Sequence, residues 1–144
     1  MTPERERRLL QIAVAVACLV PFAAGGAGIV LSTAMLKHVG LPWTPDLDSH
    51  FRYLSGLLLG VGIAFAACIP RIEDKGLLFR GLTVAVVTGG LARLVSLLDF
   101  GPPSAGHAFG LVMELGVVPV LALWQARIAR LFHDWLAEER PLGR

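Results

Sequence analysis

An apolar run over residues 80–98 begins at Arg80 and has a single full charge inside it, Arg93, and this run limits what the chain can fold into more than any other feature. About 20 apolar residues in a helix span the roughly 30 Å hydrocarbon core of a bilayer. The run is therefore predicted to be a transmembrane helix with a charge at membrane depth. Such a charge is costly unless it is paired or hydrated, so an intramembrane arginine is a candidate functional residue.

The composition of the whole chain agrees with a membrane protein. Of its 144 residues, 55% are hydrophobic and 17% are charged, which is too apolar for an ordinary soluble domain. The formal charge is only +2, and the basic residues lie at the ends of the apolar runs instead of in one patch. We therefore expect no nucleic-acid partner.

Four apolar runs separated by short polar segments predict four transmembrane helices, at about residues 9–36, 50–68, 77–98 and 105–130. Short connections force neighbouring helices to run antiparallel. The predicted fold is therefore all-α: an integral membrane, antiparallel four-helix bundle in up-down-up-down order, forming a single domain over residues 1–144.

Two local features of these helices are predicted from residue type. Asp48 or Ser49 is expected to cap the second helix by accepting from its free amide groups. Pro119 is expected to bend the fourth helix just after Glu114, because proline removes a backbone hydrogen bond.

Small residues recur at every fourth position on three of the helices, and each row includes one charge. The rows are Arg52, Gly56, Gly60 and Ala64; Gly81, Ala85, Gly89 and Arg93; and Gly106, Gly110 and Glu114. Residues four apart share a helix face, and small residues let transmembrane helices approach closely. We therefore predict that these faces pack inside the bundle and that the charges point at protein instead of lipid.

Arg52, Arg93 and Glu114 form the centre of the predicted site, and three more residues are expected close by: Tyr53, Ser96 and His50. One interpretation is an outward-opening polar pocket. Two arginines against one glutamate leave a positive charge for an anionic ligand or for Asp99, with Glu114 as counter-charge or proton acceptor and Tyr53 as a donor. The structural alternative is a polar clamp that fixes how the helices pack. A third interpretation has Arg52 reaching out to the lipid headgroups.

No metal, cofactor or catalytic residue is predicted. His50 and His107 lie at helix starts without a partner at ligand spacing, and Cys18 and Cys68 lack CxxC spacing. The P-loop, nucleophile-elbow, HExxH and GxGxxG patterns are absent from the sequence. An enzyme is therefore the third candidate, behind a binding module and an accessory protein.

Several short motifs occur in order along the chain: residues 49–56 (SHFRYLSG), 69–73 (IPRIE), 89–96 (GGLARLVS), and Glu114 followed by Pro119 and residues 123–127 (LWQAR). Together they resemble the small bacterial membrane proteins of domain of unknown function 4345, which are grouped with DoxX-like four-helix proteins. The resemblance implies four transmembrane helices in the bacterial inner membrane and no established activity. DoxX-like relatives are associated with quinone-linked sulfur oxidation, redox partners and membrane-protein chaperoning, but this chain lacks a CxxC pair for thiol–quinone chemistry.

Two functions follow from these observations. The first is a binding or carrier module for a small amphipathic anion, a lipid or a quinone. The second is an accessory subunit or membrane-protein chaperone whose Arg/Glu cluster is structural. The expected partners are the lipid bilayer, a small amphipathic or lipid ligand, and either another membrane protein or a second copy of this chain.

The distribution of basic residues predicts the orientation in the membrane. Ten Lys and Arg residues lie in the N-terminal head, the second loop and the C-terminal tail, including Arg140 and Arg144, whereas Lys37 alone lies in the first or third loop. By the positive-inside rule, both termini are cytoplasmic, and Arg52, Arg93 and Glu114 lie in the outer half of the membrane.

We predict that a reporter enzyme active only outside the cytoplasm will be inactive when fused to the C-terminus, because the tail stays in the cytoplasm. A fusion in the loop between the first two helices should be active. Activity of the C-terminal fusion would contradict the predicted orientation.

Overall fold

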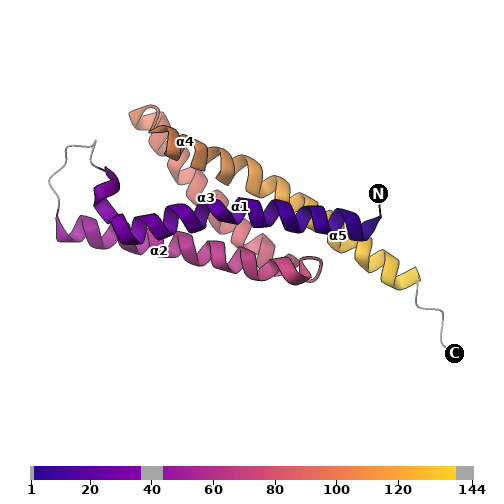
Figure 1. Ribbon diagram of the computed structural model, residues 1–144. Helices are drawn as coiled ribbons and strands as arrows, with labels where there is room; N and C mark the ends of the chain where they lie inside the picture. The colour runs from indigo at the N-terminus through magenta and orange to yellow at the C-terminus, as the bar shows by residue number, and fades with distance from the viewer. Residues whose placement is uncertain (1, 37–43, 139–144) are drawn as a thin grey trace. The chain divides into compact units, whose positions relative to one another are not determined.

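The computed structural model describes residues 2–36 and 44–138, and this part of the chain is all-helical (Figure 1). Its elements are α1 (Pro3–Leu31), the 3₁₀ turn η1 (Ser32–Leu36), α2 (Pro45–Cys68), the 3₁₀ turn η2 (Ile69–Arg71), α3 (Gly76–Phe100), α4 (Ala105–Val112), the π-helical turn η3 (Met113–Val117) and α5 (Val118–Glu138). Lys37, Arg140 and Arg144, which entered the prediction of orientation, lie outside the described residues.

Within the described residues, four helical stretches are long and apolar enough to cross a membrane: Pro3–Met35, Pro45–Arg71, Gly76–Phe100 and Ala105–Trp135. Their apolar windows are only 22, 17, 11 and 6% buried within the protein, and Leu77 and Leu123 are 88% and 73% exposed. Exposed apolar surface on this scale is a liability in water, whereas in a bilayer it faces hydrocarbon. The four predicted apolar spans are therefore present as helices.

The chain divides into two compact units. Val14–Ile69 is called the α1–α2 unit, and Met1–Ala13 together with Pro70–Arg144 is called the α3–α5 unit. The arrangement of all four helices as one up-down-up-down bundle stays a prediction, since it concerns both units together.

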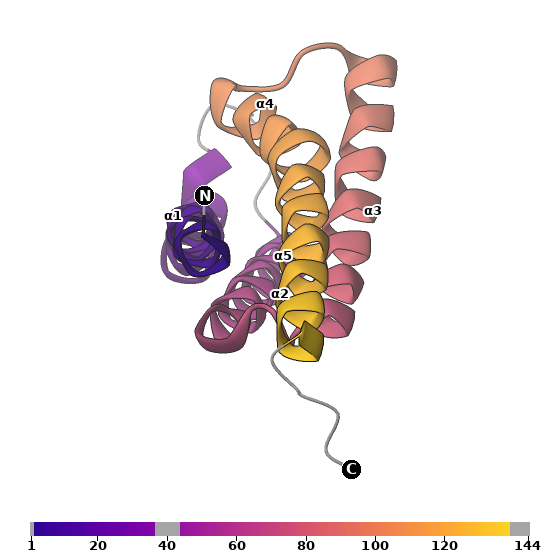
Figure 2. The same cartoon turned by 90° about the vertical axis from the view of Figure 1, so that its right-hand side faces the viewer.

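The helices of each unit run antiparallel to one another, because contact positions fall along one helix as they rise along the other. In the α1–α2 unit, Gly25 lies against Leu59 and Gly62 lies against Pro21, and Figure 1 shows the two helices side by side. In the α3–α5 unit, Gly76 lies against Gln125 and Gly90 lies against Leu115 (Figure 2). Each unit is thus built on an antiparallel helical hairpin.

The close approach of α1 and α2 depends on glycines outside the predicted row. A Cβ atom at Gly28 would lie 2.1 Å from Ser55 Oγ and 2.7 Å from Ser55 Cβ, and one at Gly25 would lie 2.8 Å from the backbone nitrogen of Leu59. At Gly56 and Gly60 nothing lies within 4 Å. The prediction that the Gly56 and Gly60 face packs closely is therefore wrong for this unit, because α1 meets the neighbouring face of α2.

On α3, too, the close contact lies beside the predicted row of small residues. A Cβ atom at Gly90 would lie 2.7 Å from Leu115 Cδ2 and 2.9 Å from Glu114 Cβ, whereas Gly81 and Gly89 have open space. Within this unit, the prediction that α3 packs closely at Gly81 and Gly89 is therefore wrong. Because Gly89 and Gly90 are adjacent, α3 could pack closely at either of them, and the sequence alone does not show which face is used.

The helix ends differ from the predicted residues 9, 36, 50 and 130: α1 begins at Pro3, α2 begins at Pro45 and α5 ends at Glu138. Thr44, not Asp48 or Ser49, caps α2: its Oγ1 accepts from the backbone N–H of Leu47 at 3.2 Å, and Pro45 occupies the first helical position. A proline there is favourable because its fixed φ suits the helix and its missing N–H is not needed. The first helix ends at Leu31 instead of residue 36, since Ser32 has a φ of 48° and the chain continues as η1.

We predict that Gly28→Ala lowers the free energy of unfolding of the full chain in mild detergent by about 1–3 kcal/mol, because the new methyl group overlaps the Ser55 side chain. Gly26→Ala is the matched control: nothing lies within 4 Å of its Cβ position, and alanine is the better helix former. Equal effects of the two substitutions would mean that α1 and α2 do not pack at Gly28.

Candidate functional site

An ion pair between α3 and the π-helical turn η3 forms the centre of the α3–α5 unit's polar surface. Arg93 donates from Nε to Glu114 Oε2 at 3.0 Å and from its terminal Nη2 to Oε1 at 3.1 Å. The side chain of Arg93 is 34% exposed and that of Glu114 18% exposed. Both residues lie inside apolar spans, so in a bilayer each charge is stabilised chiefly by the other.

The π-helical turn is explained by the proline that follows it. In a regular α-helix the ring of Pro119 would clash with the carbonyl group of Leu115, and Pro119 has no N–H to bond to that group. The turn Met113–Val117 widens the helix just before this proline. Single π-turns inside helices occur often at functional sites. The predicted disturbance at Pro119 is thus a π-turn that contains Glu114.

Two glycines shape the surroundings of the ion pair. Gly90 allows α3 to approach η3 closely beside the ion pair, because a Cβ atom at Gly90 would lie 2.9 Å from Glu114 Cβ. Gly110 lies one turn before Glu114, and its Cβ position is 3.9 Å from both Arg93 Cζ and Glu114 Oε1. The pair is therefore enclosed on the Gly90 side and bordered by a residue without a side chain at Gly110.

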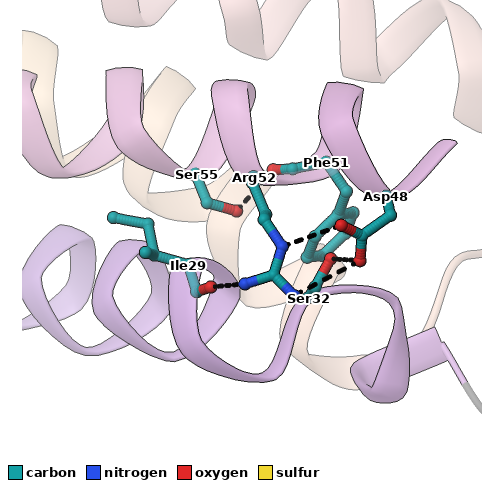
Figure 3. A network of polar contacts seen from close by, with 6 residues as sticks. All are labelled: Ile29, Ser32, Asp48, Phe51, Arg52 and Ser55. Atoms are coloured by element: carbon teal, nitrogen blue, oxygen red, sulfur yellow. Dashed lines mark hydrogen bonds and ion pairs between the residues drawn. The ribbon is translucent and has the colours of Figure 1, made fainter. Parts of the chain in front are cut away.

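A second polar network joins α1, η1 and α2 within the α1–α2 unit (Figure 3). Arg52 donates to both carboxylate oxygens of Asp48, from Nε at 2.8 Å and from Nη2 at 3.4 Å, and its Nη1 donates to the backbone carbonyl of Ile29. Ser32 Oγ donates to Asp48 Oδ1 at 2.5 Å. Arg52 thereby satisfies a carbonyl at the end of α1, where the helix leaves such groups without partners and where a positive charge is favourable.

This network changes the charge balance expected from the sequence. Two arginines against one glutamate suggested a surplus positive charge, but Arg52 has a carboxylate of its own in Asp48, four residues earlier on the same helix. Arg93 in turn is paired with Glu114. Each of the two predicted site arginines is therefore balanced by a carboxylate of its own unit.

The three remaining predicted residues are exposed and take no part in either network. Tyr53 is 63% exposed, and His50 and Ser96 are also exposed. Among residues 2–36 and 44–138, no side-chain hydrogen bond joins any of the three to Arg52, Arg93 or Glu114. Their role as ligand contacts stays a prediction.

A third polar cluster was missed by sequence reasoning, which treated its charges only as markers of orientation. Arg7 Nη1 donates to Glu73 Oε1 at 2.9 Å, and the Arg7 guanidinium lies 5.1 Å from the centre of the Phe132 ring. Arg127 pairs with Glu6 at 3.0 Å. These contacts fix the first turns of α1 to the turn before α3 and to α5. Partners 66 positions apart leave no local pattern from which they could be predicted.

Gln125, on α5, could have been recognised from the sequence as a structural residue, because it is an amide within an apolar run. Its side chain is fully buried, and Nε2 donates to the backbone carbonyl of Ile72 at 2.8 Å. A buried amide in this position ties α5 to the segment that leads into α3. Gly76 leaves room for it, since its Cβ position is only 3.4 Å from Gln125 Nε2.

Four helices able to span a membrane, with ion pairs inside the spans, define the class as a multi-pass membrane protein. The chain belongs to the family described as "Domain of unknown function (DUF4345)", whose sequence profile matches residues 9–125. The family predicted from the short motifs is thereby confirmed. Comparison with curated proteins and with solved structures found no match.

We predict strong energetic coupling between Arg93 and Glu114. Glu114→Gln or Arg93→Met alone should destabilise the protein by about 2–4 kcal/mol, because each leaves a charge unpaired at membrane depth. The double variant should recover most of that loss. Unfolding in mild detergent provides the free energies, and additive losses in the double variant would show that the two side chains act independently.

Proposed function

We propose that this protein binds or carries a small amphipathic anion in the bacterial inner membrane, with Arg93 as the anion contact and Glu114 as its counter-charge. The observation that supports this most directly is a bidentate Arg–Glu pair within the apolar spans, with Glu114 in a π-turn and about one third of the arginine side chain exposed. Ionisable groups kept within the membrane commonly mark substrate or ion pathways.

The proposed arrangement is an up-down-up-down bundle with both termini in the cytoplasm. It is supported by the antiparallel hairpin within each unit and by the short connection between Arg71 and Gly76. The excess of basic residues at the proposed cytoplasmic ends supports the orientation. In this orientation Arg93, seven residues before the end of α3, lies about 10 Å from the outer end of that helix. The ligand then enters from the outer leaflet.

A second candidate function, an accessory subunit or membrane chaperone, is favoured by a different observation. Arg52 and Asp48 are hydrogen-bonded to each other, and they also bond the Ile29 carbonyl and the Ser32 hydroxyl at the end of α1. Such a closed set of hydrogen bonds is what a purely structural clamp requires. If the Arg93–Glu114 pair has the same role, the protein offers its surface to a partner and needs no small ligand. The relation to DoxX-like proteins stays a prediction and is not needed for either candidate.

Native mass spectrometry of the full chain, purified from its own membranes in mild detergent, distinguishes the two candidates. We predict one retained amphipathic anion per chain, lost in Arg93→Gln and kept in Arg80→Gln. Arg80 is the matched control because it lies on the same helix but bonds its own Gly76 carbonyl. A stoichiometric protein partner together with no retained small molecule would support the accessory role and contradict the binding module.

A further inference from the structure

The guanidinium of Arg93 already binds a carboxylate, that of Glu114, through two hydrogen bonds. Its Nε and Nη2 donors lie 3.0 and 3.1 Å from the two oxygens of Glu114, so one planar edge of the arginine holds both. Arginine pairs with carboxylates in this geometry through two parallel hydrogen bonds, whereas a quinone carbonyl offers a single acceptor atom. A ligand carboxylate can therefore replace that of Glu114 with the same charge and the same two bonds.

Gly110 provides the side from which a second carboxylate can approach. Its Cβ position is 3.9 Å from both Arg93 Cζ and Glu114 Oε1, so no side chain of that residue covers the pair. Apolar side chains close in sequence to the pair are exposed on the outward faces of both helices: Phe109 (53%), Val112 (63%), Leu91 (52%) and Val95 (56%). A charged head at Arg93 would leave a hydrocarbon tail among apolar side chains and lipid, which is the environment that such a tail prefers.

Displacement of Glu114 from Arg93 has a consequence for its charge. An ionised carboxylate without a partner is strongly disfavoured in an apolar span, so the displaced group takes up a proton from water. The other titratable or charged side chains on the packed elements α3, α4 and η3 are Arg80, Asp99 and His107. On α5, which also packs against α3 and η3, they include Arg127, which pairs with Glu6, and Arg130, His133 and Asp134. None of them forms an ion pair with Glu114 within the part of the chain that the structure describes. His107 instead bonds Ser104 Oγ through Nδ1 at 2.9 Å. No second cation therefore replaces Arg93.

We propose that Arg93 exchanges Glu114 for the carboxylate of an amphipathic monocarboxylate that enters beside Gly110, and that Glu114 takes up one proton for each ligand bound. One negative charge enters with the ligand and one positive charge enters with the proton, so the site remains neutral overall. No covalent bond other than the new O–H bond of Glu114 is formed. This inference rests on the proposed function, because it names the ligand class and the proton coupling of the same site.

The test uses the full chain in lipid nanodiscs with a fluorescent polyene fatty acid as the probe and its methyl ester as the uncharged control. Binding is followed by fluorescence, and proton uptake by an indicator dye in weakly buffered solution. We expect the acid to bind with the uptake of one proton per ligand, and the ester to bind at least roughly tenfold more weakly. Glu114→Gln should bind the acid at least as tightly as the unaltered chain but take up no proton.

Gly110→Val tests the entry side without removing either charge, and Gly106→Val is its matched control one turn earlier, where nothing lies within 4 Å of the Cβ position. We expect roughly a tenfold loss of affinity for the acid in the first variant and none in the second. If Gly110→Val does not fold, Gly110→Ala replaces it, because its single methyl group meets both partners at ordinary contact distance, and it should show a smaller loss.

The outcomes separate this inference from the proposed function. Binding of the acid without proton uptake, or equal affinity of Gly110→Val and Gly106→Val, overturns the exchange at Arg93 while leaving an anion-binding protein. Tighter binding of a long-chain alkyl phosphate than of the acid overturns the assignment to carboxylates. Failure of the acid, the alkyl phosphate and an alkyl sulfate to bind overturns both the inference and the proposed function.

Discussion

The pairing of Arg93 with Glu114 is the interaction on which the account of this protein depends. A charge within an apolar span has no water to stabilise it, and its insertion costs about 2.5–3.5 kcal/mol per residue even on the most permissive scale. The chain meets this constraint by placing an acid and a base on facing helices, 3.0 Å apart, within one unit. The α1–α2 unit meets it differently, with Arg52 bonded to Asp48 on its own helix and to the carbonyl end of α1. Both of the predicted site arginines are therefore balanced by a carboxylate.

Close helix packing determines where those pairs can form. Lipid tails are as apolar as leucine, so helices in a bilayer gain little from burying large side chains and depend on close contact and polar bonds. Gly28 admits Ser55 in one unit, and Gly90 admits Leu115 and the Cβ of Glu114 in the other. The second contact holds the π-turn against α3 and so fixes the distance between Glu114 and Arg93. A Cβ atom at Gly110, by contrast, would meet only the ion pair, at 3.9 Å. The pair is therefore closely packed on the side of Gly90 and less closely packed on the side of Gly110.

The sequence predicted the helical class, the family and the charges within the apolar spans, because long apolar runs and charges within them are local signals. It also placed Arg93, Gly110 and Glu114 on facing helices, where the structure has them. It did not predict which face of each helix packs, since Gly89 and Gly90 are adjacent and a rotation of about 100° separates their directions. The pairing of Arg52 with Asp48 was missed because Asp48 was interpreted as a helix cap, a role that Thr44 fills. The contacts of Arg7 with Glu73 join distant segments and depend on the fold itself.

We expect Glu114 to be ionised and paired with Arg93 in the ligand-free protein within a bilayer. Infrared spectroscopy of the full chain, carrying ¹³C-labelled glutamate in lipid bilayers, tests it when the spectrum of Glu114→Gln is subtracted from that of the unaltered chain. We predict that the difference at neutral pH contains the bands of an ionised carboxylate and no carbonyl band of a protonated acid. A protonated-acid band that disappears in Glu114→Gln would contradict the account, because Arg93 would then have no counter-charge to exchange.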